Sequence, residues 1–185
     1  ADEVVAGKSL ARTILNQPVL IWRSSDGVVS ALADTCPHRW APLSQGRTDD
    51  AGVRCGYHGL KFDRAGLCIE NPHGPIINAL KVRSFPLLER HAMLWIWMGD
   101  DVSAADYSDI PDMRFVDETK PTAISKGYMY TKAGHKLLED NILDLSHADF
   151  LHPETLGGGQ FTRARAHVEE KGDTVFVQWL TNNEP

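Results

Sequence analysis

Two short stretches of the sequence each pair a cysteine with a histidine. Cys36 and His38 are separated by one residue, Cys55 and His58 by two, and sixteen residues lie between the two pairs. Thiolates and imidazoles are common ligands of transition metals. Because each pair falls in a turn between predicted strands, two loops are expected to bring four ligands together into one metal centre.

Two kinds of centre use two cysteines and two histidines. Structural zinc sites usually space cysteine with cysteine and histidine with histidine, which these mixed pairs do not match. A Rieske [2Fe–2S] centre binds one iron through two cysteines and the other through two histidines. Mixed pairs suit that centre, because each loop then gives one ligand to each iron. A zinc-stabilised binding module is the alternative that the spacing disfavours.

Several neighbouring residues carry weaker signals. Cys68 has no histidine beside it and is expected to be a small buried strand residue. Trp40 and Tyr57 lie within the two loops, where they either shield the centre or pack as ordinary aromatic residues. His73, in NPHGP, is interpreted as a loop histidine rather than as a metal ligand.

A second set of candidate ligands, Asp144, His147 and His152, lies in NILDLSHADFLH. On a continuous helix Asp144 and His147 share a face, whereas His152 points away from them. Pro153 disfavours helical geometry at His152, so the helix is expected to break or bulge there and let His152 swing back. Two histidines and a carboxylate form the facial triad of non-haem Fe(II) oxygenases. The local interpretation is therefore an iron site, with a surface helix carrying scattered polar residues as the alternative.

The first hundred residues have the pattern of short strands that would position the two Cys/His loops. PVLIWRSSDGVVSALA predicts a hairpin around Asp26 and Gly27, LKFDRAGLCIE repeats that pattern, and LKVRSFPLLERHAMLWIWMGD adds two or three strands. Residues 1–100 are therefore predicted to form one antiparallel β domain. Residues 101–120 are acidic, contain Pro111 and are predicted to be a connector.

Residues 121–185 begin a second region with a different pattern. GYMYTKAGH is interpreted as a strand, and HKLLEDNILDLSHADFL is predicted to be one long helix that HPETLGGGQ ends. FTRARAHVEEKGDTVFVQWLTNN predicts two strands joined by a turn at Lys171, Gly172 and Asp173. The expected fold class is α+β, an antiparallel β domain followed by the start of an α+β domain.

At these residues the chain resembles a known family. CPHRWAPLSQG and CGYHGLKFD are similar to the two ligand loops of the Rieske non-haem iron oxygenases. Respiratory Rieske proteins add one cysteine to each loop and form a disulfide, and this chain lacks both. The resemblance implies a Rieske [2Fe–2S] domain followed by a helix-grip-like catalytic domain. The implied cluster ligands are Cys36, His38, Cys55 and His58.

The resemblance assigns the second set of residues differently from the local interpretation. In the similar family motif, His147 and His152 bind a mononuclear Fe(II), and Asp144 is a bridge that carries electrons. Asn141, which precedes the motif, is a further candidate catalytic residue. The third ligand is a carboxylate much later in the chain, and Asp173 comes too early. It is therefore expected outside this sequence, which is interpreted as a fragment of a longer chain. The local interpretation makes Asp144 a ligand and the resemblance makes it a bridge, and the bridge is the role expected here.

Further stretches, among them ARTILNQPVLIW, VRSFPLLER and LWIWMGD, resemble the vanillate O-demethylase and dicamba monooxygenase branch. The branch implies a cytoplasmic, homotrimeric oxygenase component. With O2 and electrons from a reductase or ferredoxin, it would O-demethylate a methoxy-aromatic acid. Ring hydroxylation and N-demethylation are alternatives. A Rieske electron carrier without oxygen chemistry is a further one, although a carrier has no use for the helix motif.

The composition excludes some classes of partner. The formal net charge of −6 argues against a broad nucleic-acid-binding surface. No apolar run reaches the roughly 18 residues that a membrane-spanning helix needs, so no membrane partner is expected. The three cysteines, with no visible signal peptide, argue against a disulfide framework.

Overall fold

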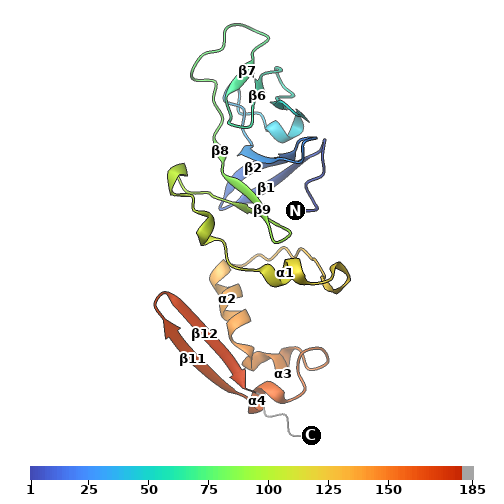
Figure 1. The fold of residues 1–185 in the computed structure, drawn as a ribbon, viewed down its shortest axis with the longest axis vertical. Coiled ribbons are helices and arrows are strands. Elements are labelled where there is room, and N and C mark those ends of the chain that lie inside the picture. Colours follow the sequence, from blue (N-terminus) through green and yellow to red (C-terminus); the bar gives the residue numbers. More distant parts are fainter. Residues whose placement is uncertain (181–185) are drawn as a thin grey trace. The chain divides into compact units, whose positions relative to one another are not determined.

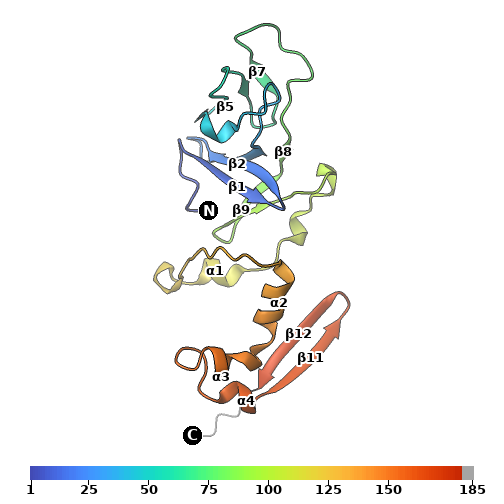
Figure 2. The same ribbon diagram turned by 180° about the vertical axis from the view of Figure 1, so that it is seen from behind.

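The computed structural model describes residues 1–180. The chain divides into two compact units, Ala1–Ser125 and Lys126–Pro185, the second of which is described as far as Leu180. Figures 1 and 2 show the elements of each unit from opposite sides. The division follows closely after the predicted connector. Because the first unit contains both the predicted β domain and the predicted connector, the division does not test the predicted limits at residues 100 and 120, which stay predictions.

The first unit is built from antiparallel strands. One four-stranded sheet has the order β1-β2-β3-β8, formed by Ser9–Ile14, Gln17–Arg23, Val29–Ala33 and Ser84–Phe85. A second has the order β4-β5-β6-β7, formed by Arg47–Asp49, Gly52–Arg54, Lys61–Phe62 and Cys68–Glu70. A separate hairpin pairs β9, Leu87–Arg90, with β10, Met93–Ile96.

The predicted hairpin around Asp26 and Gly27 is confirmed as β2 and β3. The Asp26 carboxylate accepts hydrogen bonds from the Ser24 hydroxyl at 2.6 Å and from the Val28 backbone N–H at 3.1 Å. Gly27 adopts a φ of 84°, a conformation that glycine tolerates without steric cost. The second predicted hairpin is confirmed as β6 and β7.

Strand β2 lies between two apolar clusters, which is why four consecutive residues, Val19 to Trp22, are all buried. Val19 and Ile21 face one cluster, together with Phe85. Leu20 and Trp22 face the other, which also contains Cys36 and Cys55. The second cluster is completed by the buried side chains Leu32, Leu43, Val53, Leu60, Phe62, Cys68 and Val82. Both cysteines of the predicted centre are therefore buried in this apolar cluster. Cys68 is a buried residue of β7, as expected.

The predicted connector is an ordered series of short turns. Asp101 and Asp106 cap 3₁₀ turns by accepting hydrogen bonds from the backbone N–H groups of Ser103 and Ser108. An aspartate side chain at such a position satisfies a backbone donor that the turn itself leaves unpaired. The short helix α1, Arg114–Glu118, follows.

The second unit begins with helices and ends with a hairpin. The helices are α2, His135–Leu143, α3, Ala148–Leu151, and α4, Gln160–Arg163. Strands β11, Arg165–Lys171, and β12, Thr174–Leu180, form the predicted hairpin, which is confirmed. The end of the predicted second strand, residues 181–183, lies outside the described residues. No helix in residues 1–180 is long and apolar enough to cross a bilayer.

Three expectations for this unit are wrong. GYMYTKAGH contains no strand, and its last residue, His135, begins α2. Residues 161–163 belong to α4 rather than to a strand. The long helix is interrupted at Asp144, whose φ of −95° and ψ of 96° are extended. The Leu143 carbonyl freed by this break accepts a hydrogen bond from the Trp179 indole N–H at 3.3 Å. A residue of β12 therefore helps to satisfy the broken helix end.

Candidate metal centres

The two Cys/His loops have the same backbone hydrogen-bond frame. In the first, Cys36 N–H donates to the Ala41 carbonyl at 2.9 Å, and Trp40 N–H donates to the Cys36 carbonyl at 2.8 Å. In the second, Cys55 N–H donates to Leu60 at 2.8 Å, and Gly59 N–H to Cys55 at 3.1 Å. The spacing along the chain is identical in both loops. Each loop thus closes tightly around its cysteine.

The residue four positions after each cysteine has a left-handed backbone. Trp40 has a φ of 54° and Gly59 a φ of 77°. This conformation is routine for glycine and uncommon for a tryptophan, so the loop geometry overrides the local preference of Trp40. Trp40 and Tyr57 are exposed, so neither is packed in the core of the first unit.

The two loops approach each other closely enough to bring their cysteines together. A Cβ on Gly46, just after the first loop, would lie 2.0 Å from the Arg54 carbonyl oxygen, so this approach requires glycine. Cys36 and Cys55 are each 2% exposed. Burial raises the pKa of the Cys36 thiol, the His38 backbone N–H opposes that rise, and the adjacent Cys55 thiol adds to it. Two buried neighbouring sulfur atoms are the arrangement that one iron of the predicted cluster needs.

The two histidines of the loops also meet, but nearer the surface than the cysteines. The rings of His38 and His58 have centroids 4.6 Å apart and an interplanar angle of 68°. His38 is exposed and His58 is half-buried, whereas both cysteines are buried. Desolvation, followed by the nearby charges of His38, His73 and Arg39, lowers the pKa of His58. The residues thus fit a two-iron cluster with an inner sulfur side and an outer imidazole side.

Side chains outside the Cys/His pairs hold the loops in place, and sequence analysis missed them. The buried Asp34 carboxylate accepts hydrogen bonds from Ser44 N–H at 2.7 Å and from the Ser44 hydroxyl at 2.6 Å, which closes the base of the first loop. Arg54 donates to the Gly59 carbonyl at 2.8 Å and pairs with Glu70 at 2.5 Å. In the sequence, the only signal for these supporting contacts is the position of Asp34, two residues before Cys36.

The second set of residues is organised by the break at Asp144. The Asp144 side chain accepts a hydrogen bond from Ser146 N–H at 2.9 Å and so caps the 3₁₀ turn Leu145–His147. Hydrogen bonds from the Ser146 hydroxyl, first, and from its backbone N–H hold the pKa of Asp144 below its usual value. Asp144 therefore lies at a junction between helices, not on a shared helix face as the sequence predicted.

The tautomer of His147 follows from its neighbours. Its Nδ1 lies 2.6 Å from the Asp144 carbonyl oxygen, which can only accept a hydrogen bond, so Nδ1 carries the proton. In the neutral ring Nε2 then keeps its lone pair, and the Asn141 side-chain amide approaches it at 3.4 Å. Metal-binding histidines commonly donate their other ring N–H to a carbonyl in this way. His147 is thus prepared to bind a metal through Nε2.

His152 approaches His147 as the sequence predicted. Helix α3 ends at Leu151, and His152 has a non-helical φ of −127° and ψ of 45°. The two rings have centroids 5.6 Å apart and an interplanar angle of 75°. Among residues 1–180 the structure gathers no three His, Cys, Asp or Glu side chains in the manner of a metal site. His147 and His152 thus form a pair, and each iron of the predicted cluster would likewise take only two protein ligands, so neither centre requires three such side chains from the described residues. The choice between ligand and bridge for Asp144 stays a prediction.

Comparison with known families gives two matches. Residues 1–86 match the Rieske [2Fe–2S] domain, and residues 131–185 match the vanillate O-demethylase oxygenase C-terminal domain. The first match contains all four residues of the two Cys/His pairs, and the second contains Asn141, Asp144, His147 and His152.

Similar proteins and solved structures agree with these matches. Dicamba O-demethylase, oxygenase component, of Stenotrophomonas maltophilia is 44% identical over 90% of this chain and 49% of its own length. A putative toluene-4-sulfonate monooxygenase iron-sulfur subunit of Comamonas testosteroni is 40% identical over 96% of this chain and 52% of its own length. The crystal structure of dicamba monooxygenase bound to dicamba aligns with a TM-score of 0.87 and 39% identity, covering 97% of this chain and 55% of that one. Another structure of that enzyme contains non-haem iron and dicamba.

These similarities extend along nearly the whole sequence, although the chain spans about half the length of the relatives that it matches. The family models cover the two parts of the molecule in which the structure places the Cys/His loops and the histidine pair. The chain joins a Rieske [2Fe–2S] domain to part of a vanillate O-demethylase-type oxygenase domain, and it belongs to the Rieske non-haem iron oxygenases.

Proposed function

We propose that this chain supplies the electron-carrying domain and the two histidine iron ligands of an oxygenase component that O-demethylates a methoxy-aromatic acid. The proposal rests on one observation, which is that a single chain contains both kinds of site. It has the paired Cys/His loops in its first unit and, in its second unit, a histidine, His147, whose Nε2 lone pair is available to bind a metal. An electron carrier needs only the first feature. Similarity to dicamba O-demethylase supports O-demethylation as the reaction class.

Each loop contributes to both irons of the cluster in this proposal. Cys36 and Cys55 bind the buried iron, and His38 and His58 bind the outer iron, because the cysteines are buried and the histidines lie nearer the surface. When bound, the cluster supplies electrons one at a time, and a mononuclear iron supplies the activation of O2. The imidazole side is then the exit for electrons that arrive from a reductase or ferredoxin.

The second unit provides for the mononuclear iron. His147 and His152 bind it, with a carboxylate from outside this sequence as the third ligand. Asn141 keeps the His147 ring in place through its contact with Nε2 when the metal is absent. Asp144 is a bridge rather than a ligand, since its carboxylate caps a turn and its carbonyl orients His147. By similarity to the family, it connects His58 of one subunit with the iron of the next in a cytoplasmic homotrimer.

The proposed reaction balances with two electrons. A methoxy-aromatic acid, O2, two electrons and two protons give the phenol, formaldehyde and water. The test combines the complete protein with a reductase or ferredoxin and a panel of methoxybenzoates. Phenol, formaldehyde and consumed O2 in equal amounts are the expected result. A ring diol without formaldehyde, or formaldehyde from N-methyl compounds alone, would move the assignment to ring hydroxylation or N-demethylation. Cluster reduction without O2 consumption would indicate an electron carrier.

A further inference from the structure

His73 lies outside both Cys/His loops and was expected to be an ordinary loop histidine. Its Nε2 lies 2.9 Å from the backbone carbonyl oxygen of His58. Because a carbonyl oxygen can only accept, Nε2 of His73 carries a proton and donates it to this bond. A third histidine therefore holds the backbone of a proposed cluster ligand.

The turn that carries His73 is itself braced. The Asn71 side chain accepts a hydrogen bond from His73 N–H at 3.1 Å and donates one to the Pro75 carbonyl at 2.9 Å. Pro72 lies against the second loop, because a Cβ on Gly59 would be 3.3 Å from Pro72 Cγ. The Asn71–Pro75 turn thus contacts the second loop at two consecutive residues, His58 and Gly59.

The contact is placed where it controls the orientation of the His58 imidazole. The bonded carbonyl belongs to the peptide that joins His58 to Gly59, where the chain turns through the left-handed φ of 77° at Gly59. Fixing that peptide plane restricts the ψ angle of His58 and so the backbone position from which its side chain projects. The His73 ring stands nearly perpendicular to the His58 ring, at 84° with centroids 5.9 Å apart. The same His58 ring also contacts the ring of His38.

We propose that His73 is a positioning residue for the cluster ligand His58, an inference that rests on the proposed function. His73 binds no iron and touches no substrate. Its N–H holds the ligand peptide, and the positive end of the N–H dipole lies at the His58 carbonyl, beside the proposed outer ligand. The reduced cluster carries one more negative charge than the oxidised one, so this dipole favours reduction. Without it the potential falls and the His58 ring takes a wider range of orientations.

The test uses the complete protein with two substitutions at the same position. His73→Ala removes the donor, whereas His73→Gln places a side-chain amide N–H near the position of Nε2. Ile77→Ala, at an exposed residue of the same segment, is the matched control. The measurements are iron and acid-labile sulfide content, the EPR spectrum of the reduced cluster and its reduction potential. We expect His73→Ala to show a lower potential, broader EPR lines and a several-fold faster loss of cluster. His73→Gln should restore most of the wild-type behaviour, and Ile77→Ala should match the wild type.

Each outcome decides the inference. Loss of the cluster in His73→Ala but not in His73→Gln supports it. A wild-type potential, EPR spectrum and cluster lifetime in His73→Ala would overturn it, and so would equal changes in His73→Ala and His73→Gln. A wild-type protein with no acid-labile sulfide would instead refute the proposed function, so the two failures are distinguishable.

Discussion

The backbone carbonyl of Asp144 accepts a hydrogen bond from Nδ1 of His147 at 2.6 Å, while the Asp144 carboxylate accepts one from Ser146 N–H. One residue thus orients a proposed iron ligand through its main chain and presents a negative charge through its side chain. The two roles can be separated by mutation, because a side-chain substitution leaves the carbonyl in place.

Asp144→Asn should keep the mononuclear iron and slow the transfer of electrons to it from the cluster. The amide keeps the size and one acceptor oxygen of the carboxylate but not its charge. We expect wild-type iron content and a reducible cluster, with oxidation of the cluster in a single turnover slowed by roughly 10–100-fold, as for other residues that orient and tune a ligand. Asp173→Asn, in the turn between β11 and β12, is the control. An iron-free Asp144→Asn protein with an intact fold would make Asp144 a ligand and restore the local triad.

His147→Ala and His152→Ala should each remove the mononuclear iron and abolish turnover in the complete protein. The Rieske EPR signal and the sulfide content should remain at wild-type levels, because the proposed cluster ligands lie in the first unit. His167→Ala, at an exposed residue of β11, is the matched histidine control. Normal activity in either ligand variant would show that the iron site is misplaced.

Cys36→Ser should lose the [2Fe–2S] cluster, whereas Cys68→Ser should retain it. Both thiols are buried, but Cys68 donates a hydrogen bond to the Glu70 carbonyl, a contact that a serine hydroxyl can replace. Acid-labile sulfide and visible absorption measure the difference. Equal loss in both variants would mean that the core tolerates no serine, and would remove the support for Cys36 as a ligand.

Ser44→Ala should weaken the base of the first loop. The substitution removes one hydrogen bond to the buried Asp34 carboxylate and leaves the backbone one. We expect a loss of about 1–2 kcal/mol in the free energy of unfolding, measured with urea, together with faster release of the cluster. Ser125→Ala, at an exposed position, is the control. An unchanged rate of cluster release would show that the Asp34 contact supports only the fold.

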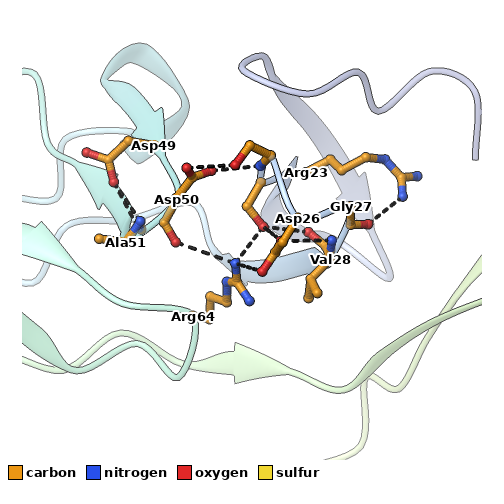
Figure 3. A network of polar contacts seen from close by, with 11 residues as sticks. Arg23, Asp26, Gly27, Val28, Asp49, Asp50, Ala51 and Arg64 are labelled. Carbon is orange, nitrogen blue, oxygen red and sulfur yellow. Dashed lines mark hydrogen bonds and ion pairs between the residues drawn. The ribbon is translucent and has the colours of Figure 1, made fainter.

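The polar network around Asp26 should stabilise the fold near neutral pH and lose this effect in acid (Figure 3). Hydrogen bonds from Ser24, first, and Arg64 lower the pKa of Asp26 to about 2. Because the pKa of Asp26 is lower in the folded protein than the value of 3.8 in the unfolded chain, its ionised carboxylate stabilises the fold above pH 3.8. This stabilisation is lost as the pH falls toward about 2. Arg64→Met should therefore destabilise the protein at pH about 7, and its difference from the wild type should shrink below pH about 4. A constant difference down to pH about 3, measured by urea unfolding, would contradict the role of Asp26.

The sequence by itself determined the strands that have local signals and the types of metal centre that the chain is built for. The turn at Asp26 and Gly27 and the turn at Gly172 lie between strongly patterned strands, so nearest neighbours in the chain were sufficient to predict both hairpins. The mixed Cys/His pairs indicated a two-iron cluster because ligand type and spacing are chemical properties of the sequence. The departure of His152 from the helix also followed locally, from the proline after it.

Only the tertiary structure decided where the helix breaks and what holds the Cys/His loops. No proline or glycine lies near Asp144 to predict the interruption, which is accompanied by a hydrogen bond from Trp179 to the carbonyl of Leu143, 36 residues before it. Asp34 reaches Ser44 across a loop, and His73 reaches His58 from beyond two strands. Such contacts depend on which segments the sheets bring together, and propensity and periodicity describe only residues close along the chain. The sequence therefore indicated the candidate ligands, and the fold supplied the groups that hold those residues in place.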